Sequence, residues 1–214
     1  NKMFLTGNAL NAFKLLVELG LLEHLFPDLA TVLQEEPQSS AIELVRLGLQ
    51  GTDERVRADK SVTPTFLFAV LLWPAMQRAY AQAARQDGAE VQQLLAICEE
   101  ATARQQARVA IPKRFTLPMR EVIGLQPRFE RREGRRALRL LDHPRFRAAY
   151  DFLLLRAAAG EVDTALAQWW TEIQTLPADQ KIARVADGEP GQRTQSRRPR
   201  RRKRRRGPRP PVPT

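Results

Sequence analysis

Apolar residues recur every three or four positions along most of the chain, and no segment alternates apolar and polar residues as a strand does. The first helix is expected over 9–19, because its apolar residues share one face and Gly20 follows as a C-terminal cap. A short helical turn should stop at Pro27, and further helices should pass through 29–33 and 41–50. A polar and charged stretch then precedes the next apolar segment.

The most apolar segment lies between residues 64 and 76 and is expected to be the most deeply buried helix. Thr63 provides a hydroxyl N-cap, and Pro64 suits the first helical position. The residues that follow, TFLFAVLLW, are apolar on every side of a helix, which predicts burial all round. Pro74 should kink the helix, which continues to Gly88. The run is too short for a bilayer span, which needs about 20 residues.

The second half of the chain predicts further helices. One covers 89–109, and the central stretch 111–156 should form two or three helices, broken near Pro127, Gly134 and Pro144. The break at Pro127 leaves open whether Arg120 and Arg128 share a face.

A last helix is expected over 162–174, where adjacent Trp169 and Trp170 cannot face the core equally, so that one should lie at a seam. Order should fade from about Pro177, and the tail from Gly188 contains no core residues. We therefore predict an all-α fold of many helices, followed by a disordered basic tail. Its expected parts are a scaffold at 1–109, an arginine-rich binding domain at 110–176 and the tail at 177–214.

The positive charge is concentrated in two blocks. The net charge is +11, and residues 190–214 alone hold 11 basic and no acidic side chains. Residues 104–156 hold 14 basic and 5 acidic side chains. The flanking segments are acidic, with 8 basic and 13 acidic residues over 1–103, and 2 basic and 6 acidic residues over 157–189. Positive charge segregated in this way indicates a polyanionic partner.

The arginines of the central block are the candidate binding residues, because guanidinium groups form paired hydrogen bonds with phosphates. Arg128, Arg131 (or Arg132), Arg135 and Arg139 recur at spacings of three and four, which makes one stripe on a continuous helix. A purely solvated face is the alternative. The candidate phosphate-binding residues are Lys113, Arg114, Arg120, Arg128, Arg131, Arg132, Arg135, Arg136, Arg139, Arg145, Arg147, and, in the tail, Arg200, Arg201, Arg202, Lys203, Arg204, Arg205 and Arg206. For the tail, charge alone leaves RNA, DNA and acidic lipid open as partners.

Some of these side chains have structural alternatives. Arg120 beside Glu121, and Arg131 near Glu130 and Glu133, are candidates for carboxylate pairing. Aromatic residues interleave with the arginines and can stack on bases: Phe115, Phe129, Phe146 and Tyr150. Core packing is the stronger expectation, because Phe146 and Tyr150 are spaced i, i+4 beside Leu153 and Leu154. The acidic neighbours at 35–36, 53–54 and 99–100 are expected to be solvated helix or loop surface.

The chain shows no motif for catalysis or metal binding. It contains no Gly-rich phosphate loop, no Ser/His/Asp set and no Cys/His ligand spacing, so we predict no catalytic and no metal-binding residues. Cys98 is expected to be a small buried residue in a reducing compartment, which favours the cytoplasm. The sequence starts inside a helical pattern without a Met, so we expect a fragment or a processed chain.

Three segments and a Trp pair resemble a known family. FLTGNALNAFKLLVELGLLEHLFPDL at 4–29 resembles the neck of class II nucleotidyltransferases, which include bacterial poly(A) polymerases and CCA-adding enzymes. AIPKRFTLPMREVIGLQPRF at 110–129, RREGRRALRLLDHPRFRAAYDFLLLRA at 131–157 and the Trp pair at 169–170 resemble the body of bacterial poly(A) polymerase. The basic C-terminus fits that family as well.

The resemblance implies an enzyme that adds adenylates from ATP to RNA 3′ ends with Mg²⁺. The catalytic head of that family would precede residue 1, so no catalytic residue carries over, this chain should bind no cofactor and the fragment alone should be inactive. The expected partners are RNA 3′ ends and that head. The alternatives are a stand-alone, non-catalytic helical RNA-binding protein and the body of a CCA-adding enzyme.

Overall fold

The computed structural model describes residues 2–83 and 88–186, and all regular elements in these ranges are helical, as predicted. A 3₁₀ turn at Lys2–Phe4 precedes them. The α-helices are α1 Ala9–Glu18, α2 Leu22–Leu25, α3 Pro27–Glu35, α4 Ser40–Arg57, α5 Pro64–Gln82, α6 Glu90–Gln106, α7 Lys113–Phe129, α8 Gly134–Leu141, α9 Phe146–Ala158, α10 Thr164–Thr175 and α11 Ala178–Ala186. None of them is long and apolar enough to cross a membrane.

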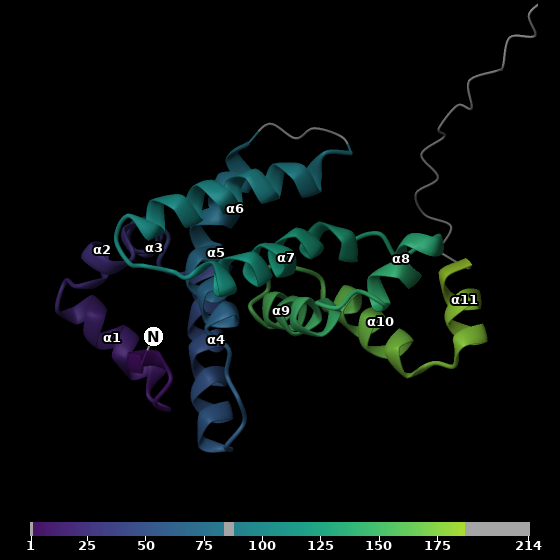
Figure 1. Ribbon diagram of the computed structural model, residues 1–214, viewed down its shortest axis with the longest axis horizontal. Helices are drawn as coiled ribbons and strands as arrows, with labels where there is room; N and C mark the ends of the chain where they lie inside the picture. The colour runs from purple at the N-terminus through teal and green to yellow at the C-terminus, as the bar shows by residue number, and fades with distance from the viewer. Residues whose placement is uncertain (1, 84–87, 187–214) are drawn as a thin grey trace, which may run out of the picture.

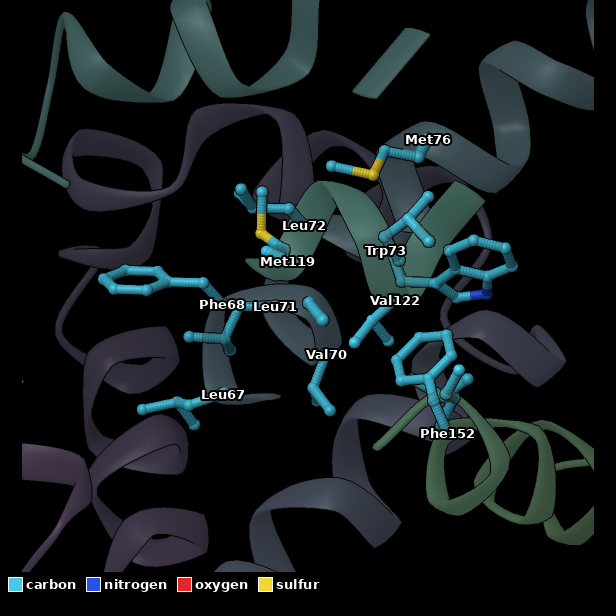
Figure 2. Close-up of a cluster of buried hydrophobic side chains, with 14 of the residues drawn as sticks. Leu67, Phe68, Val70, Leu71, Leu72, Trp73, Met76, Met119, Val122 and Phe152 are labelled. Carbon is cyan, nitrogen blue, oxygen red and sulfur yellow. The ribbon is translucent and has the colours of Figure 1, made fainter. Parts of the chain in front are cut away.

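Helix α5 forms the centre of the packing, as its apolar sequence predicts. It contacts α3, α4, α6 and α7, so helices from both halves of the chain surround it (Figure 1). Every side chain from 67 to 73 is at most 3% exposed. Figure 2 shows these residues meeting Met119 and Val122 of α7 and Phe152 of α9. The helix continues through Pro74, which is itself buried.

Helix α4 is longer than the pattern predicts, because it continues through the charged residues after position 50 to Arg57. Asp53, expected on a solvated surface, is instead only 4% exposed, which corrects that expectation. Its carboxylate accepts hydrogen bonds from the backbone N–H groups of Ala9 and of Leu10, the latter at 3.1 Å. These are unpaired donors of the first turn of α1, so Asp53 caps α1 from a distant segment.

Helix α7 runs without a break through Pro118 and Pro127 to Phe129, which corrects the predicted break at Pro127. A proline inside a helix removes one backbone hydrogen bond and costs about 3 kcal/mol in an exposed helix. Burial offsets this cost, since five apolar side chains of α7 are at most 2% exposed: Met119, Val122, Ile123, Leu125 and Phe129. The predicted break near Gly134 is confirmed: residues 130–133 leave the helix, and α8 starts at Gly134 with a positive φ of 65°.

The C-terminal helices extend from α7 to one side of the molecule (Figure 1). Helix α9 packs against α4 and α7, α10 packs against α9, and α11 packs against α8. Trp170 is fully buried and donates from Nε1 to the carbonyl of Phe129 at 2.9 Å, whereas Trp169 is partly buried. Helix α11 corrects the expectation that order fades from Pro177. The predicted disorder from Gly188 lies outside the described residues.

The cap on α1 supplies a stability prediction. Replacing Asp53 with Ala leaves two backbone donors without an acceptor, one of them in the buried residue Ala9, and we expect a loss of about 2 kcal/mol in the free energy of unfolding. Urea denaturation measures the loss. The neighbouring change Glu54→Ala is the matched control, because that exposed carboxylate contacts only Gln50, and it should cost less than about 0.5 kcal/mol. Equal losses for both changes would contradict the capping role.

Candidate nucleic-acid interface

The structure divides the cations of the central block into paired and unpaired groups. The paired group uses carboxylates of other helices. Arg120 Nε lies 2.7 Å from Glu99 of α6, and Arg131 Nη2 lies 3.0 Å from Glu90 at the start of α6. The prediction that these two arginines pair with carboxylates is confirmed, but the partners are not their sequence neighbours.

Two more candidates are paired close to α9. Arg145 Nε lies 2.7 Å from Glu121 of α7, and Arg147 Nε lies 3.1 Å from Asp151 one turn further along α9. All four of these arginines remain partly exposed, so each pair is a surface contact of modest strength. Their charge is nonetheless locally compensated.

Seven candidate cations form no ion pair with a carboxylate among the described residues. Two stand at the start of α7, and we call them the α7-start pair: Lys113 and Arg114. Five lie between the last turn of α7 and the end of α8, and we call them the α8 cluster: Arg128, Arg132, Arg135, Arg136 and Arg139. Six of the seven side chains are exposed, and Arg132 is intermediate.

Helix α8 presents its arginines because its other face is anchored. Ala137 and Leu140 are buried on that face, and α11 packs against the helix. Residues 135, 136 and 139 fall within about 100° of helical rotation, so their side chains leave from one side. Glu130 and Glu133 in the preceding turn are exposed, which leaves the α8 cluster with a surplus of positive charge.

The stripe that these arginines would form on a continuous helix is divided between two helices, because the chain breaks just before Gly134, near one of the predicted breaks. Arg128 is near the end of α7, whereas Arg135 and Arg139 lie on α8 beyond the break at 130–133. Arg131 sits in that break and is held by Glu90. The structure thus brings Arg128 and the α8 arginines to neighbouring segments but not to a single helix face.

The aromatic residues of the block are packed in the interior, as expected. The Phe129 and Trp170 rings meet edge to face at 5.1 Å, and Phe146 and Tyr150 stack at 5.9 Å. All four side chains are at most 8% exposed. Phe115 is partly buried against Phe68. The four buried rings offer no open face to a nucleobase, and the surface offers phosphate contacts instead.

A buried ion pair between Arg156 of α9 and Glu161 in the turn that follows is linked to α7 through a hydrogen bond. Arg156 Nε lies 3.1 Å from Glu161, and their side chains are only 14% and 2% exposed. Glu161 also accepts from Trp73 Nε1 at 2.8 Å, and Arg156 donates to Gln126 of α7 at 3.3 Å. Burial raises the pKa of the Glu161 carboxyl, and the Arg156 charge opposes that rise. Arg156 is therefore structural and lies outside the exposed surface.

One exposed arginine of the basic block is missing from the predicted phosphate-binding residues. Arg108, five residues before Lys113, is exposed and has no carboxylate partner among the described residues. It is not among the predicted phosphate-binding residues, although its position inside the basic block indicates such a role.

Cys98 is buried as predicted, and burial raises the pKa of its thiol to about 11, so it is an unreactive core residue.

No cluster of three or more His, Cys, Asp and Glu side chains suited to a metal ion occurs in residues 2–83 and 88–186. The tail candidates Arg200, Arg201, Arg202, Lys203, Arg204, Arg205 and Arg206 lie outside the described residues.

An all-helical scaffold that exposes unpaired arginines is the arrangement expected of a polyanion-binding protein. Residues 74–207 match the family described as "Polymerase A arginine-rich C-terminus", and residues 1–33 match "Probable RNA and SrmB- binding site of polymerase A". The chain belongs to the poly(A) polymerase family, and the predicted resemblance is confirmed.

Curated relatives agree with this assignment. Poly(A) polymerase I of Escherichia coli O157:H7 is 37% identical over 204 residues, which cover 92% of this chain and 43% of the relative. The Salmonella typhi enzyme of the same name is 36% identical over 198 residues, covering 90% and 42%. That of Haemophilus influenzae Rd is 31% identical over 182 residues, covering 84% and 40%. The chain thus spans less than half the length of these relatives.

The buried ion pair behind α7 supplies a prediction. Replacing Glu161 with Ala leaves the Arg156 guanidinium and Trp73 Nε1 without their shared acceptor, and we expect a loss of about 3–5 kcal/mol in the free energy of unfolding. Denaturant unfolding is the measurement. Glu172→Ala removes the exposed partner of Arg184 and should cost less than about 1 kcal/mol. If both variants lost the same small amount, Glu161 would not support the fold as described.

Proposed function

We propose that this chain supplies the RNA-binding part of a polynucleotide adenylyltransferase, an enzyme that extends RNA 3′ ends with adenylates from ATP. The α8 cluster is the observation that supports the proposal. Its five cations have no ion-pair partner among the described residues, and they lie in the segment that matches the arginine-rich family region.

The α8 cluster suits a phosphate backbone better than a base sequence. Guanidinium groups donate paired hydrogen bonds to phosphate oxygens, and each contact releases counterions from the nucleic acid. The nearby aromatic rings are buried, so affinity should depend on charge and salt more than on base identity. A template-independent polymerase that must hold an RNA of any sequence needs this kind of contact.

The parts of the chain divide the work. Residues 1–109 act as the scaffold, and residues 110–176 carry the arginine surface, backed by α11. The tail, with seven consecutive basic residues at 200–206, raises the local concentration of RNA through electrostatic attraction. Of the candidate cations, the unpaired ones bind RNA directly, and the paired ones, Arg120, Arg131, Arg145 and Arg147, first hold the helices in place.

The remaining steps belong to the full-length protein. We place ATP, Mg²⁺ and catalysis on a head in the same polypeptide, because relatives are more than twice as long as the matched region. This chain alone is then inactive, and its RNA binding takes place in the cytoplasm. Matching the arginine-rich polymerase A region favours adenylate addition over CCA addition and over a stand-alone binding protein.

The dependence of RNA affinity on salt tests the proposal. For a single strand, log K falls with log[salt] by about 0.7 for each phosphate neutralised. The triple change Arg135→Ala, Arg136→Ala and Arg139→Ala removes three such contacts. We expect a weaker affinity and a slope that is smaller by about 2, measured by fluorescence anisotropy with an oligoadenylate.

The matched control removes three exposed charges far from α8, through Arg46→Ala, Arg55→Ala and Lys60→Ala on and just after α4. Its slope should stay within about 0.5 of that of the unmodified chain, because these residues lie outside the proposed surface. If the α8 triple variant kept both the affinity and the slope of the unmodified chain, the proposed function of this surface would be wrong.

A further inference from the structure

The unpaired cations of the described block stand at the two ends of α7 and not along its middle. The α7-start pair occupies the first turn, and Arg128 of the α8 cluster occupies the last. Arg114 and Arg128 are fourteen residues apart, which is almost four full turns, so both side chains leave the helix on nearly the same side. Both are exposed, and the helix between them is continuous.

The middle of this face is electrically compensated. Glu121 lies seven residues from each end cation, and it is hydrogen-bonded to Arg145 at 2.7 Å. Arg120 is turned towards α6 and paired with Glu99. Leu117, one turn after the α7-start pair, is 60% exposed and apolar. A polyanion along α7 would therefore find phosphate partners at both ends and none between them.

We propose that α7 binds single-stranded RNA at two separate points, the α7-start pair and the α8 cluster, with the strand bridging the neutral middle. This inference rests on the proposed function and adds the path of the RNA strand along α7 and the RNA length needed to reach both points. The fourteen residues from Arg114 to Arg128 span about 21 Å at 1.5 Å per residue. A stacked strand advances about 3.4 Å per nucleotide, so the bridge takes about six nucleotides.

Two-point binding sets a length threshold. An RNA of four nucleotides reaches one point only, and it occupies the α8 cluster, which has the larger charge. An RNA of ten or more nucleotides reaches both, and the second contact forms at high effective concentration because the first already holds the strand. Affinity should then rise by about tenfold between these lengths, beyond the gradual gain from additional binding registers.

The test measures the affinity of the whole chain for oligoadenylates of 4, 6, 8, 10, 12 and 16 nucleotides by fluorescence anisotropy at low salt. The variant Lys113→Ala with Arg114→Ala should bind the 4-mer as the unmodified chain does and lose about tenfold in affinity for the 12-mer. The matched control, Arg55→Ala with Lys60→Ala, removes the same charge from the far end of α4 and should retain the rise. The series is repeated with residues 200–206 changed to Ser, so that tail charge does not obscure the rise.

The results separate this inference from the function on which it rests. A smooth increase with length, or an equal loss for 4-mer and 12-mer in the Lys113/Arg114 variant, overturns the two-point path. If that variant matches the unmodified chain at every length while the Arg135/Arg136/Arg139 variant binds weakly, RNA binding at α8 stands and the α7-start pair has no part in it. If neither variant changes binding at any length, the proposed function fails as well.

Discussion

The contact between α6 and α7 is the constraint on which the binding surface depends. At Gly124 the two helices approach so closely that an added Cβ would meet Leu95 Cδ2 at 2.7 Å. Along the same contact, Glu99 and Glu90 of α6 form ion pairs with Arg120 and Arg131 respectively. The close approach therefore sets both the position of α7 and the identity of the arginines that remain unpaired.

The exposed basic surface consists of the cations that this pairing leaves without a carboxylate partner. Fourteen basic residues in 104–156 would repel one another if all were free, and carboxylates from α3, α6, α7 and α9 and from the turn after α9 compensate six of them. Among the described residues, most of the arginines without a carboxylate partner lie in the last turn of α7, in the break and on α8, and Arg108 and Arg114 lie near the start of α7. Anchoring by Trp170, α11 and the buried Arg156–Glu161 pair keeps that end of the molecule ordered, so the exposed cations project from a fixed scaffold.

Local pattern predicted the fold well where one rule acted alone. Apolar periodicity placed α1, α5 and α10, and Gly20 ends α1 with a positive φ of 68° as a glycine cap should. The predictions failed where distant segments decide the outcome. The local sequence predicts that Asp53 is solvated, but its carboxylate is buried where it accepts hydrogen bonds from the first turn of α1. The local sequence predicts that a helix ends near Pro127, but buried residues before and after Pro127 pack against the core, and α7 continues to Phe129.

The candidate site was predictable as a region and not as a set of contacts. Charge counting located 104–156, and the family match agrees with it. For Arg120, Arg131 and Arg145 the carboxylate partner lies 21 to 41 residues away, and helix packing decides which partner is reached. Of the pairs described above, Arg147 with Asp151 follows the local spacing of four residues that a helix rule predicts.

Arginine-specific modification with phenylglyoxal, with and without oligoadenylate and read by mass spectrometry, shows which arginines RNA covers. We expect RNA to lower the reactivity of Arg128, Arg135, Arg136 and Arg139, while Arg46 and Arg104, which are paired with Glu43 and Asp28, react as before. Protection confined to the carboxylate-paired arginines, with the α8 cluster unchanged, would contradict this expectation.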